Sequence, residues 1–280
     1  MNDAVKPDRY AVMGDPIAHS ISPLIHQAFA KATQQNLVYE KIQINTDGFQ
    51  PELEKFVAEG GKGLNITLPL KQHAYALVDK RLESAEQAGA VNTIFIDERG
   101  NTIGSNTDGV GFCRDLLFNQ QGHIKQQRIL ICGAGGAARG LIPALMQYQP
   151  ACLHIVNRDL EKAKLLQQQF FKFGDITIGT YDETDEVFDL IINATSASVF
   201  DQVPPLSAKI IDDHTYCYDL YYSVKPTAFC RWALDRSAKV VVDGFGMLIE
   251  QAVETFYLWR GVRPAPTTVA RLLQQRTQLL

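Results

Sequence analysis

The feature that most constrains the fold is a glycine-rich turn between an apolar segment and a helix-like segment. Residues 128–132 read Arg-Ile-Leu-Ile-Cys, and residues 133–138 read Gly-Ala-Gly-Gly-Ala-Ala. The second run fits GxGxxG/A, in which glycines allow a tight turn and a close backbone approach to a pyrophosphate. Because it follows a predicted strand and opens a predicted helix, it indicates a dinucleotide-binding unit. A packed glycine turn in another kind of α/β protein is the alternative interpretation.

The residues after the next predicted strand favour NADP over NAD. NAD-binding units usually carry Asp or Glu about 20 residues beyond the glycines, where the carboxylate binds the ribose. Here the strand 153–157 ends in Asn157, followed by Arg158 and Lys162. These two cations suit a dianionic 2′-phosphate, and the missing acid also disfavours a methyltransferase that binds S-adenosylmethionine. Asp159 counts against NADP unless its carboxylate caps the next helix.

Segments of strand and helix character alternate along the chain, which predicts an α/β protein. Residues 92–96 and 102–105 flank the turn Asp97–Gly100 and predict a hairpin. From residue 108 onward, short apolar runs separated by helical segments are typical of parallel strands. We therefore expect two domains. Residues 1–107 with 244–280 form an α/β substrate-binding domain, and residues 108–243 form a Rossmann-like, doubly wound dinucleotide-binding domain.

The composition excludes several other classes of protein. The 280 residues carry a net charge of −4 without basic clusters, which argues against a nucleic-acid partner. The N-terminus lacks the apolar run of a signal peptide, and no apolar run approaches the ~18 residues of a membrane span. The five cysteines form no CxxC pair, and the histidines show no metal-ligand spacing. We expect a cytoplasmic protein without a metal site or a membrane partner.

Four polar clusters mark the places where predicted helices begin or strands end. They are His19–Pro23, Asn65–Lys71, Gly89–Thr93 and Asn106–Gly109. In the first cluster, Ser22 precedes a proline suited to the first helical position, so we expect Ser22 to be the N-cap. Helix capping alone accounts for any single cluster. Together they supply a cation, a carboxylate, hydroxyls and amides, a set suited to binding a sugar acid.

Nine motifs resemble the shikimate dehydrogenase family and occur in the family's order. They run from about residue 10 to residue 260 and read HSISP, NITLPLK, GAVNT, SNTDGVGF, GAGGAARG, NRD, INATS, YDLYY and DGFGMLIEQA. The resemblance covers nearly the whole chain. It implies the reversible NADPH-dependent reduction of 3-dehydroshikimate to shikimate, a step of aromatic amino-acid biosynthesis.

The resemblance also implies a role for individual residues. Lys71 and Asp108 are the expected catalytic pair, with Lys71 donating the proton and Asp108 orienting it. The expected substrate-binding residues are Ser20, Ser22, Thr67, Asn92, Tyr222 and Gln251. The expected cofactor-binding residues are Gly133, Ala134, Gly135, Gly136, Ala137, Asn157, Arg158, Lys162, Thr195, Leu220 and Gly244. The expected partner is the small-molecule substrate alone, bound by a monomer or a homodimer.

Some alternatives remain open. Asp159 and Lys162 stand where the family commonly has Thr and Arg, and Ser198 stands where it has Gly. A quinate/shikimate dehydrogenase that uses NAD is therefore one alternative. A non-catalytic nucleotide-binding sensor is another, although it would lack the Lys71–Asp108 pair. That pair has its own structural alternative, a salt bridge between domains. Gln251 is otherwise a half-exposed helix residue, and Tyr222 a core aromatic.

Overall fold

The computed structural model describes residues 6–269, which divide into two compact units. Among these residues, unit 1 comprises residues 6–108 and 249–269, and unit 2 comprises residues 109–248. The boundaries expected from the sequence lay at 107 and 243. The two ends of the predicted first domain, residues 1–5 and 270–280, lie outside the described residues.

Unit 1 is built on a mixed six-stranded sheet with the strand order β2-β1-β3-β5-β6-β4. The strands are β1 (Asp8–Gly14), β2 (Leu37–Gln43), β3 (Gly61–Ile66), β4 (Lys80–Arg81), β5 (Thr93–Ile96) and β6 (Thr102–Ser105). The helices are α1 (Ser22–Ala32), α2 (Phe49–Ala58), α3 (Lys71–Leu77), α4 (Glu83–Ala88) and most of α9 (Phe245–Arg260), followed by a 3-10 turn at Pro266–Val269. Strand β1 is parallel to β2 and β3. The pair β5–β6 is antiparallel, so the predicted hairpin is confirmed.

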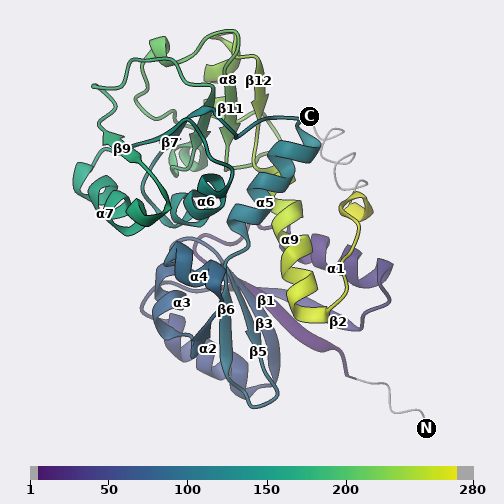
Figure 1. Cartoon of the computed structure of the whole chain (residues 1–280). Helices are drawn as coiled ribbons and strands as arrows, with labels where there is room; N and C mark the ends of the chain where they lie inside the picture. Colours follow the sequence, from purple (N-terminus) through teal and green to yellow (C-terminus); the bar gives the residue numbers. More distant parts are fainter. Residues whose placement is uncertain (1–5, 270–280) are drawn as a thin grey trace. The chain divides into compact units, whose positions relative to one another are not determined.

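Alternating residues of β1 supply both hydrophobic layers of unit 1. Ala11 and Met13 pack on one face with residues of α2, α3 and α4, whereas Tyr10 and Val12 pack on the other with Trp259 of α9. Figure 1 shows α1 and α9 on the opposite side of this sheet from α2, α3 and α4. The layering follows from the two-residue period of a strand.

Helix α9 is attached to the sheet through its last turn. The Trp259 indole Nε1 donates to the Ile94 carbonyl oxygen at 2.9 Å, and Arg260 bonds to Asp8 and to Gln35. A Cβ added to Gly63 would lie 2.5 Å from the Trp259 Nε1 atom. The glycine therefore makes room for the helix, and α9 carries its polar face to a fixed place in unit 1.

Unit 2 has an entirely parallel six-stranded sheet with the order β12-β11-β10-β7-β8-β9. The strands are β7 (Arg128–Cys132), β8 (Cys152–Val156), β9 (Ile176–Gly179), β10 (Leu190–Asn193), β11 (Tyr216–Asp219) and β12 (Val240–Val242). The helices are α5 (Asp108–Arg114), α6 (Gly136–Gln147), α7 (Leu160–Phe170) and α8 (Ala228–Leu234), with a π-helical turn at Asp115–Asn119 and 3-10 turns at Phe171–Phe173, Ala197–Phe200 and Ala208–Ile210. Read from β9 at one edge to β12 at the other, this is the 3-2-1-4-5-6 strand order of a Rossmann fold. The predicted fold class is confirmed.

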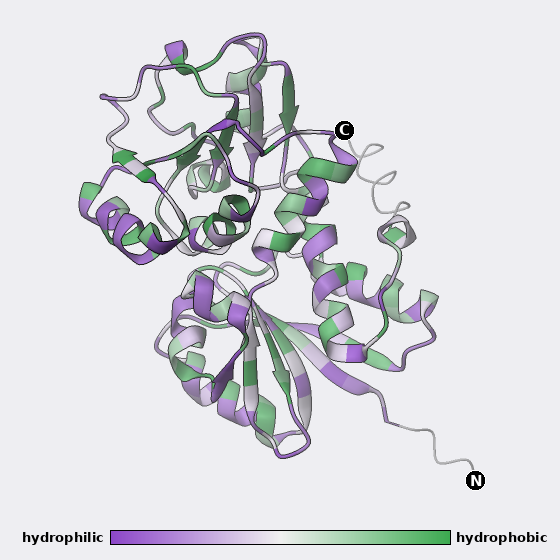
Figure 2. Ribbon diagram, viewed as in Figure 1, coloured by the Kyte–Doolittle hydropathy of each residue, from purple (hydrophilic) through white to green (hydrophobic). Residues whose placement is uncertain are grey.

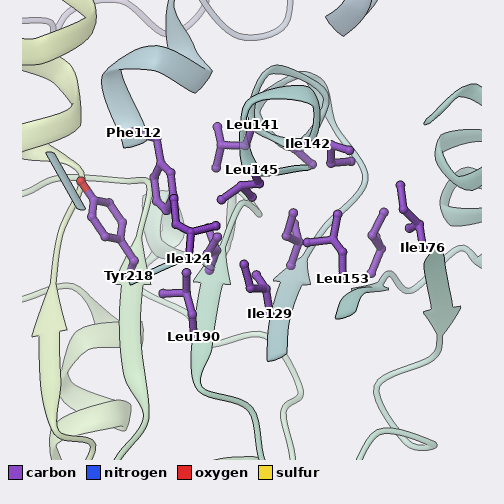
Figure 3. Packing of buried hydrophobic residues seen from close by; sticks show 14 of the residues in the cluster. Phe112, Ile124, Ile129, Leu141, Ile142, Leu145, Leu153, Ile176, Leu190 and Tyr218 are labelled. Carbon is purple, nitrogen blue, oxygen red and sulfur yellow. The ribbon is translucent and has the colours of Figure 1, made fainter. Parts of the chain in front are cut away.

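The core of unit 2 lies between the sheet and the helices that cover it. Figure 3 shows Leu141, Ile142 and Leu145 of α6 facing Ile129 and Leu153 of the strands below. In Figure 2, α7 carries both hydrophobic (green) and hydrophilic (purple) residues, as an amphipathic surface helix does. Within residues 6–269, no helix is long and apolar enough to span a membrane.

The predicted N-cap of α1 is wrong. The helix already begins at Ser22, and Ile21 occupies the N-cap position without a capping side chain. The Ser20 hydroxyl oxygen instead accepts the backbone N–H of Ser22 at 3.3 Å. Ser22 thus lies one position inside the helix, so its side chain does not cap it.

One buried side chain of unit 1 makes the folded state sensitive to pH. The His26 ring is fully buried and stacks on the Tyr39 ring at a centroid distance of 4.6 Å. Burial lowers the pKa of His26 from 6.5 to about 3, and the Asn65 side chain offsets this only in part. Between these two pH values the imidazole therefore stays neutral in the folded chain, whereas it gains a proton in the unfolded chain.

We predict that the free energy of unfolding decreases as the pH falls from about 6.5 towards 3. In this range unfolding takes up one proton at His26, which corresponds to about 1.4 kcal/mol per pH unit at most. The His26→Phe variant loses this one-proton contribution, whereas His73→Gln, which removes an exposed histidine, retains it. Urea unfolding between pH 7 and pH 4 measures the slopes. Equal slopes for the wild type and His26→Phe contradict the prediction.

Candidate functional site

Lys71 and Asp108 form the closest pair of opposite charges in the candidate site of unit 1. Lys71 is the first residue of α3, and its Nζ atom donates to Asp108 Oδ2 at 2.5 Å. The side chains are only 17% and 6% exposed, respectively. Asp108 is the first residue of α5, and its backbone N–H donates to Asn106 Oδ1. A lysine and a carboxylate so shielded from water can hold or exchange a proton at a defined place.

The Asn92 side chain fixes the orientation of the Asp108 carboxylate. Asn92 Oδ1 accepts the backbone N–H of Thr107 at 2.9 Å and the Thr93 hydroxyl at 3.0 Å. Since a backbone N–H can only donate, these bonds determine which end of the Asn92 amide is oxygen. The Nδ2 atom therefore faces Asp108 Oδ1, at 2.8 Å. Each carboxylate oxygen thus has its own donor, Asn92 on Oδ1 and Lys71 on Oδ2.

Three threonine hydroxyls connect this pair to helix α9. The Thr107 hydroxyl lies 3.3 Å from Gln251 Oε1 and 3.3 Å from the Thr255 hydroxyl. The Thr93 and Thr255 hydroxyls are 2.8 Å apart. Gln251 and Thr255 are four residues apart, so both face the same side of α9. The helix therefore contributes an amide and a hydroxyl to the polar interior of unit 1.

The network continues to the two serines of the first polar cluster. Asn65 Nδ2 reaches the Thr93 and Thr255 hydroxyls at 3.4 Å, and Asn65 Oδ1 accepts the Tyr39 hydroxyl at 2.8 Å. The Ser22 side chain lies near the Tyr39 hydroxyl and offsets part of the rise that burial causes in the Tyr39 pKa. The Ser20 hydroxyl in turn donates to the Ser22 hydroxyl at 3.2 Å.

The structure therefore brings most of the expected substrate and catalytic residues of unit 1 into one network, namely Ser20, Ser22, Lys71, Asn92, Asp108 and Gln251. Thr67 follows β3 and packs beside β1. A Cβ on Gly14 would lie 2.3 Å from its Cγ2 atom. Tyr222 belongs to unit 2, where its ring lies 6.1 Å from that of Phe245.

Five residues of this network have no role expected from the sequence, namely Tyr39, Asn65, Thr93, Thr107 and Thr255. Asn65, Thr93 and Thr107 belong to the polar clusters singled out above. Thr255 has a weaker signal, because it lies four residues after Gln251 on the same helix face. Tyr39 reads as an ordinary strand aromatic, and only its buried partner reveals its hydroxyl contact.

In unit 2 the glycine-rich turn has the geometry that a bound pyrophosphate requires. Gly133 adopts a positive φ of 104°, and a Cβ there would lie 3.1 Å from the Ala194 carbonyl oxygen. A Cβ on Gly135 would meet no atom within 4 Å, so the backbone at this position is open. Helix α6 begins at Gly136 without a side-chain cap. Its N-terminal amides can therefore donate to an anion, and Ala134 and Ala137 belong to the same turn.

The end of β8 shows what Asp159 does. Its carboxylate caps α7 by accepting the Glu161 backbone N–H at 3.1 Å, so the capping role weighed from the sequence is confirmed. Lys162 Nζ lies 4.0 Å from Asp159 Oδ2, and Asn157 Nδ2 donates to the Asp159 carbonyl oxygen. Arg158 is exposed at this strand end. Its guanidinium is thus accessible to a phosphate.

The other expected cofactor residues follow β10, β11 and β12. Thr195 lies two residues after the end of β10, and Leu220 directly follows β11. A Cβ on Gly244 would lie 2.1 Å from the Leu220 carbonyl oxygen, so a glycine is required at this contact. These loops lie at the carboxyl ends of parallel strands, where Rossmann folds bind their ligands.

The part of the chain that the structure describes contains no candidate metal site. Residues 6–269 contain no group of three or more His, Cys, Asp or Glu side chains placed to hold a metal ion. The five cysteines are free, and four of them are buried.

A Rossmann-type unit and a second α/β unit with a buried lysine–carboxylate pair define a class, the dinucleotide-dependent oxidoreductases. Comparison with family models makes the class specific. Residues 12–94 match the shikimate dehydrogenase substrate binding domain, residues 115–200 match shikimate/quinate 5-dehydrogenase, and residues 244–273 match the shikimate 5′-dehydrogenase C-terminal domain.

Curated relatives agree over nearly the full length of the chain. The shikimate dehydrogenase (NADP(+)) of Alkalilimnicola ehrlichii is 46% identical over 95% of this chain and 98% of its own. That of Herminiimonas arsenicoxydans is 47% identical over 97% and 98%. Among solved structures, the Thermus thermophilus shikimate 5-dehydrogenase in complex with NADP(H) and shikimate is 30% identical. It has a TM-score of 0.85 and covers 96% of this chain and 99% of its own. The chain belongs to the shikimate dehydrogenase family.

Proposed function

We propose that this chain catalyses the reversible NADP-linked reduction of 3-dehydroshikimate to shikimate. The observation that carries the proposal is the buried contact of Lys71 with Asp108, held by Asn92, in a chain nearly half identical to NADP-dependent shikimate dehydrogenases. A pair of this kind matches a reaction in which a carbonyl oxygen becomes a hydroxyl.

Unit 1 supplies the groups for a polyhydroxylated acid. The Ser20 and Ser22 hydroxyls would bind the substrate carboxylate. Thr67, Asn92 and Gln251 would hold ring hydroxyls, and Tyr222 of unit 2 would approach the substrate. Gln251 supports this assignment because the residue is only 9% exposed and its Oε1 atom lies 3.3 Å from the Thr107 hydroxyl, within the same polar network as Asn92. In this scheme unit 1 is the substrate-binding domain and unit 2 the NADP-binding domain.

Lys71 and Asp108 would move the proton. In the direction of reduction, negative charge develops on the ketone oxygen, and Lys71 as an ammonium stabilises that charge and donates a proton from Nζ. In the direction of oxidation, Lys71 takes the proton back. Asp108 keeps the Nζ atom in place through its Oδ2 contact and offers Oδ1 to a neighbouring substrate hydroxyl.

Unit 2 would hold the cofactor, which supplies or accepts a hydride when bound. The uncapped N-terminus of α6 and the open backbone at Gly135 fit the pyrophosphate. Arg158, with Lys162, fits a 2′-phosphate. Because Asp159 already accepts a backbone N–H of α7, its carboxylate is engaged in capping, which favours NADP over the NAD-using alternative. The sensor alternative is disfavoured by the intact Lys71–Asp108 pair.

The setting of the reaction remains a prediction. We propose that the enzyme acts in the cytoplasm as a monomer or homodimer and needs no nucleic-acid partner. The five free cysteines support a reducing compartment.

We predict turnover of shikimate with NADP⁺ well above that of the other three combinations of shikimate or quinate with NADP⁺ or NAD⁺. The accessible cation at Arg158 and the engaged carboxylate of Asp159 are the physical reason for the preference for NADP⁺, and the similarity to curated shikimate dehydrogenases (NADP(+)) supports the preference for shikimate. Initial rates of cofactor reduction at 340 nm (the reduced nicotinamide band) measure all four. Comparable rates with quinate or NAD⁺ assign the chain to the alternative branch. A chain that turns over none of the pairs is not this enzyme.

We predict that Lys71→Ala lowers kcat by about 10²- to 10⁴-fold, the usual contribution of a general acid, with little change in KM for shikimate. The variant removes the proton donor but leaves the carboxylate-binding serines intact. Lys62→Ala, which removes an exposed lysine of β3, serves as the control and keeps wild-type kinetics. A Lys71→Ala enzyme with near-normal kcat excludes the assigned role.

We predict that Arg158→Ala raises the KM for NADP⁺ by about 10- to 100-fold, as expected for the loss of hydrogen bonds to a charged group. The KM for NAD⁺, which lacks the 2′-phosphate, changes little. Lys172→Ala removes another exposed cation of unit 2 and is the matched control. Equal effects of Arg158→Ala on the two cofactors show that Arg158 does not bind the 2′-phosphate.

A further inference from the structure

A buried carboxylate lies at the cofactor end of the unit 2 sheet, outside the set of residues assigned above. Asp219 is the last residue of β11, is fully buried and accepts four hydrogen bonds. Asn193 Nδ2 and the Tyr221 backbone N–H donate to Oδ1, each at 3.1 Å. The Ser198 and Thr227 hydroxyls donate to Oδ2, each at 2.6 Å. The four donors come from the last residue of β10, from the loops after β10 and β11, and from the N-cap of α8.

Asn193 links the Asp219 carboxylate to Thr195 in the loop after β10. Asn193 ends β10 and pairs in register with Asp219. Its Oδ1 atom accepts the Thr195 hydroxyl at 2.7 Å and the Thr195 backbone N–H at 3.1 Å, while its own carbonyl oxygen accepts the Leu220 N–H at 3.0 Å. Leu220 in turn contacts Gly244. Three residues assigned to the cofactor, Thr195, Leu220 and Gly244, are therefore positioned around the Asn193–Asp219 pair.

The chemistry of the site calls for an ionised carboxylate. Only a carboxylate can accept on both atoms from four donors, because an Asn side chain in its place would turn an NH₂ group towards two of them. Burial raises the pKa of Asp219 from 3.8 to about 6, and the carboxylate of Asp243 adds to the rise. The other titratable neighbours are the thiols of Cys132 and Cys230, whose pKa values burial raises above 9, so they are neutral near pH 7. Asp219 is thus ionised at neutral pH and protonated in mild acid.

We propose that Asp219 is a positioning residue for the cofactor, whose carboxylate holds the loops after β10 and β11 in the arrangement that receives NADP. This inference rests on the proposed function, since it assumes that unit 2 binds NADP. Protonation removes one acceptor lone pair and turns a hydroxyl towards donors, so the loops loosen and binding weakens. The Ser198 hydroxyl donates to the carboxylate and so ties the loop after β10 to Asp219 at the end of β11.

The test measures NADP⁺ binding by calorimetry in the full-length chain, for the wild type and for Asp219→Asn and Ser198→Ala. At pH 7.5 we expect Asp219→Asn to raise Kd by about 10-fold or more and Ser198→Ala by about 3- to 10-fold, the range for hydrogen bonds to a charged group. The KM for shikimate stays near its wild-type value in both variants. The milder Ser198→Ala variant keeps the test valid if Asp219→Asn folds poorly.

The pH dependence separates positioning from a general loss of structure. Asp219→Asn resembles the protonated wild type, so the ratio of its Kd to that of the wild type falls towards one as the pH is lowered from 7.5 to 5. The ratio is the quantity to compare, because the 2′-phosphate of NADP⁺ titrates with a pKa near 6 in both proteins. A ratio that does not change with pH overturns the proposal.

A matched control lies at the opposite end of the same strand. Thr215 precedes β11, is fully buried and donates its hydroxyl to the Phe188 carbonyl oxygen at 2.8 Å. Thr215→Val lowers the melting temperature without changing Kd for NADP⁺. If the Asp219 and Ser198 variants behave like Thr215→Val, their role is structural and the inference is wrong. A wild-type chain that does not bind NADP⁺ overturns the proposed function as well, and so the two failures are distinguishable.

Discussion

A carboxylate buried away from water needs hydrogen-bond donors in fixed positions. In unit 1 this constraint applies to Asp108, whose donors are Lys71 and Asn92. Its two donors come from α3 and from the segment before β5, and the Asn92 amide is itself oriented by the Thr107 backbone N–H. Segments far apart in the sequence must therefore fold together before the pair has its geometry. The rigidity expected of a proton-transfer site follows from these bonds, because neither partner can turn without leaving a buried group unpaired.

Unit 2 meets the same need with different chemistry. Asp108 faces a lysine ammonium, whereas the donors named for Asp219 are an amide, two hydroxyls and a backbone N–H. Neutral donors offset desolvation less than a cation does, which is why burial raises the pKa of Asp219. One buried carboxylate is thus suited to work beside a moving proton, and the other to hold two loops whose arrangement depends on its charge.

The sequence predicted those features whose signals are local. The glycine turn after an apolar strand predicted the Rossmann unit, and the two segments around Asp97–Gly100 predicted the hairpin. Helix α4, six residues long, was not predicted, because fewer than two turns show little periodicity. The contact of Thr93 with Thr255 joins residues 162 positions apart, so only the packing of α9 against the sheet reveals it. The N-cap prediction at Ser22 failed because the helix begins one residue earlier than the Ser-Pro pattern indicates.

Ser198 shows how a departure from a family motif acquires a physical meaning. A serine where the motif has glycine suggests a changed turn, since glycine is often retained for a positive φ. In this chain, however, the residue with positive φ in that loop is Asp201, at 53°, and Ser198 lies within the 3-10 turn Ala197–Phe200. The position therefore accepts a side chain without strain. The hydroxyl that it gains is directed to Asp219 at 2.6 Å. The serine thus adds a hydrogen-bond donor to the buried carboxylate and leaves the backbone path intact. Its effect is therefore on the stabilisation of the Asp219 charge between the loops after β10 and β11.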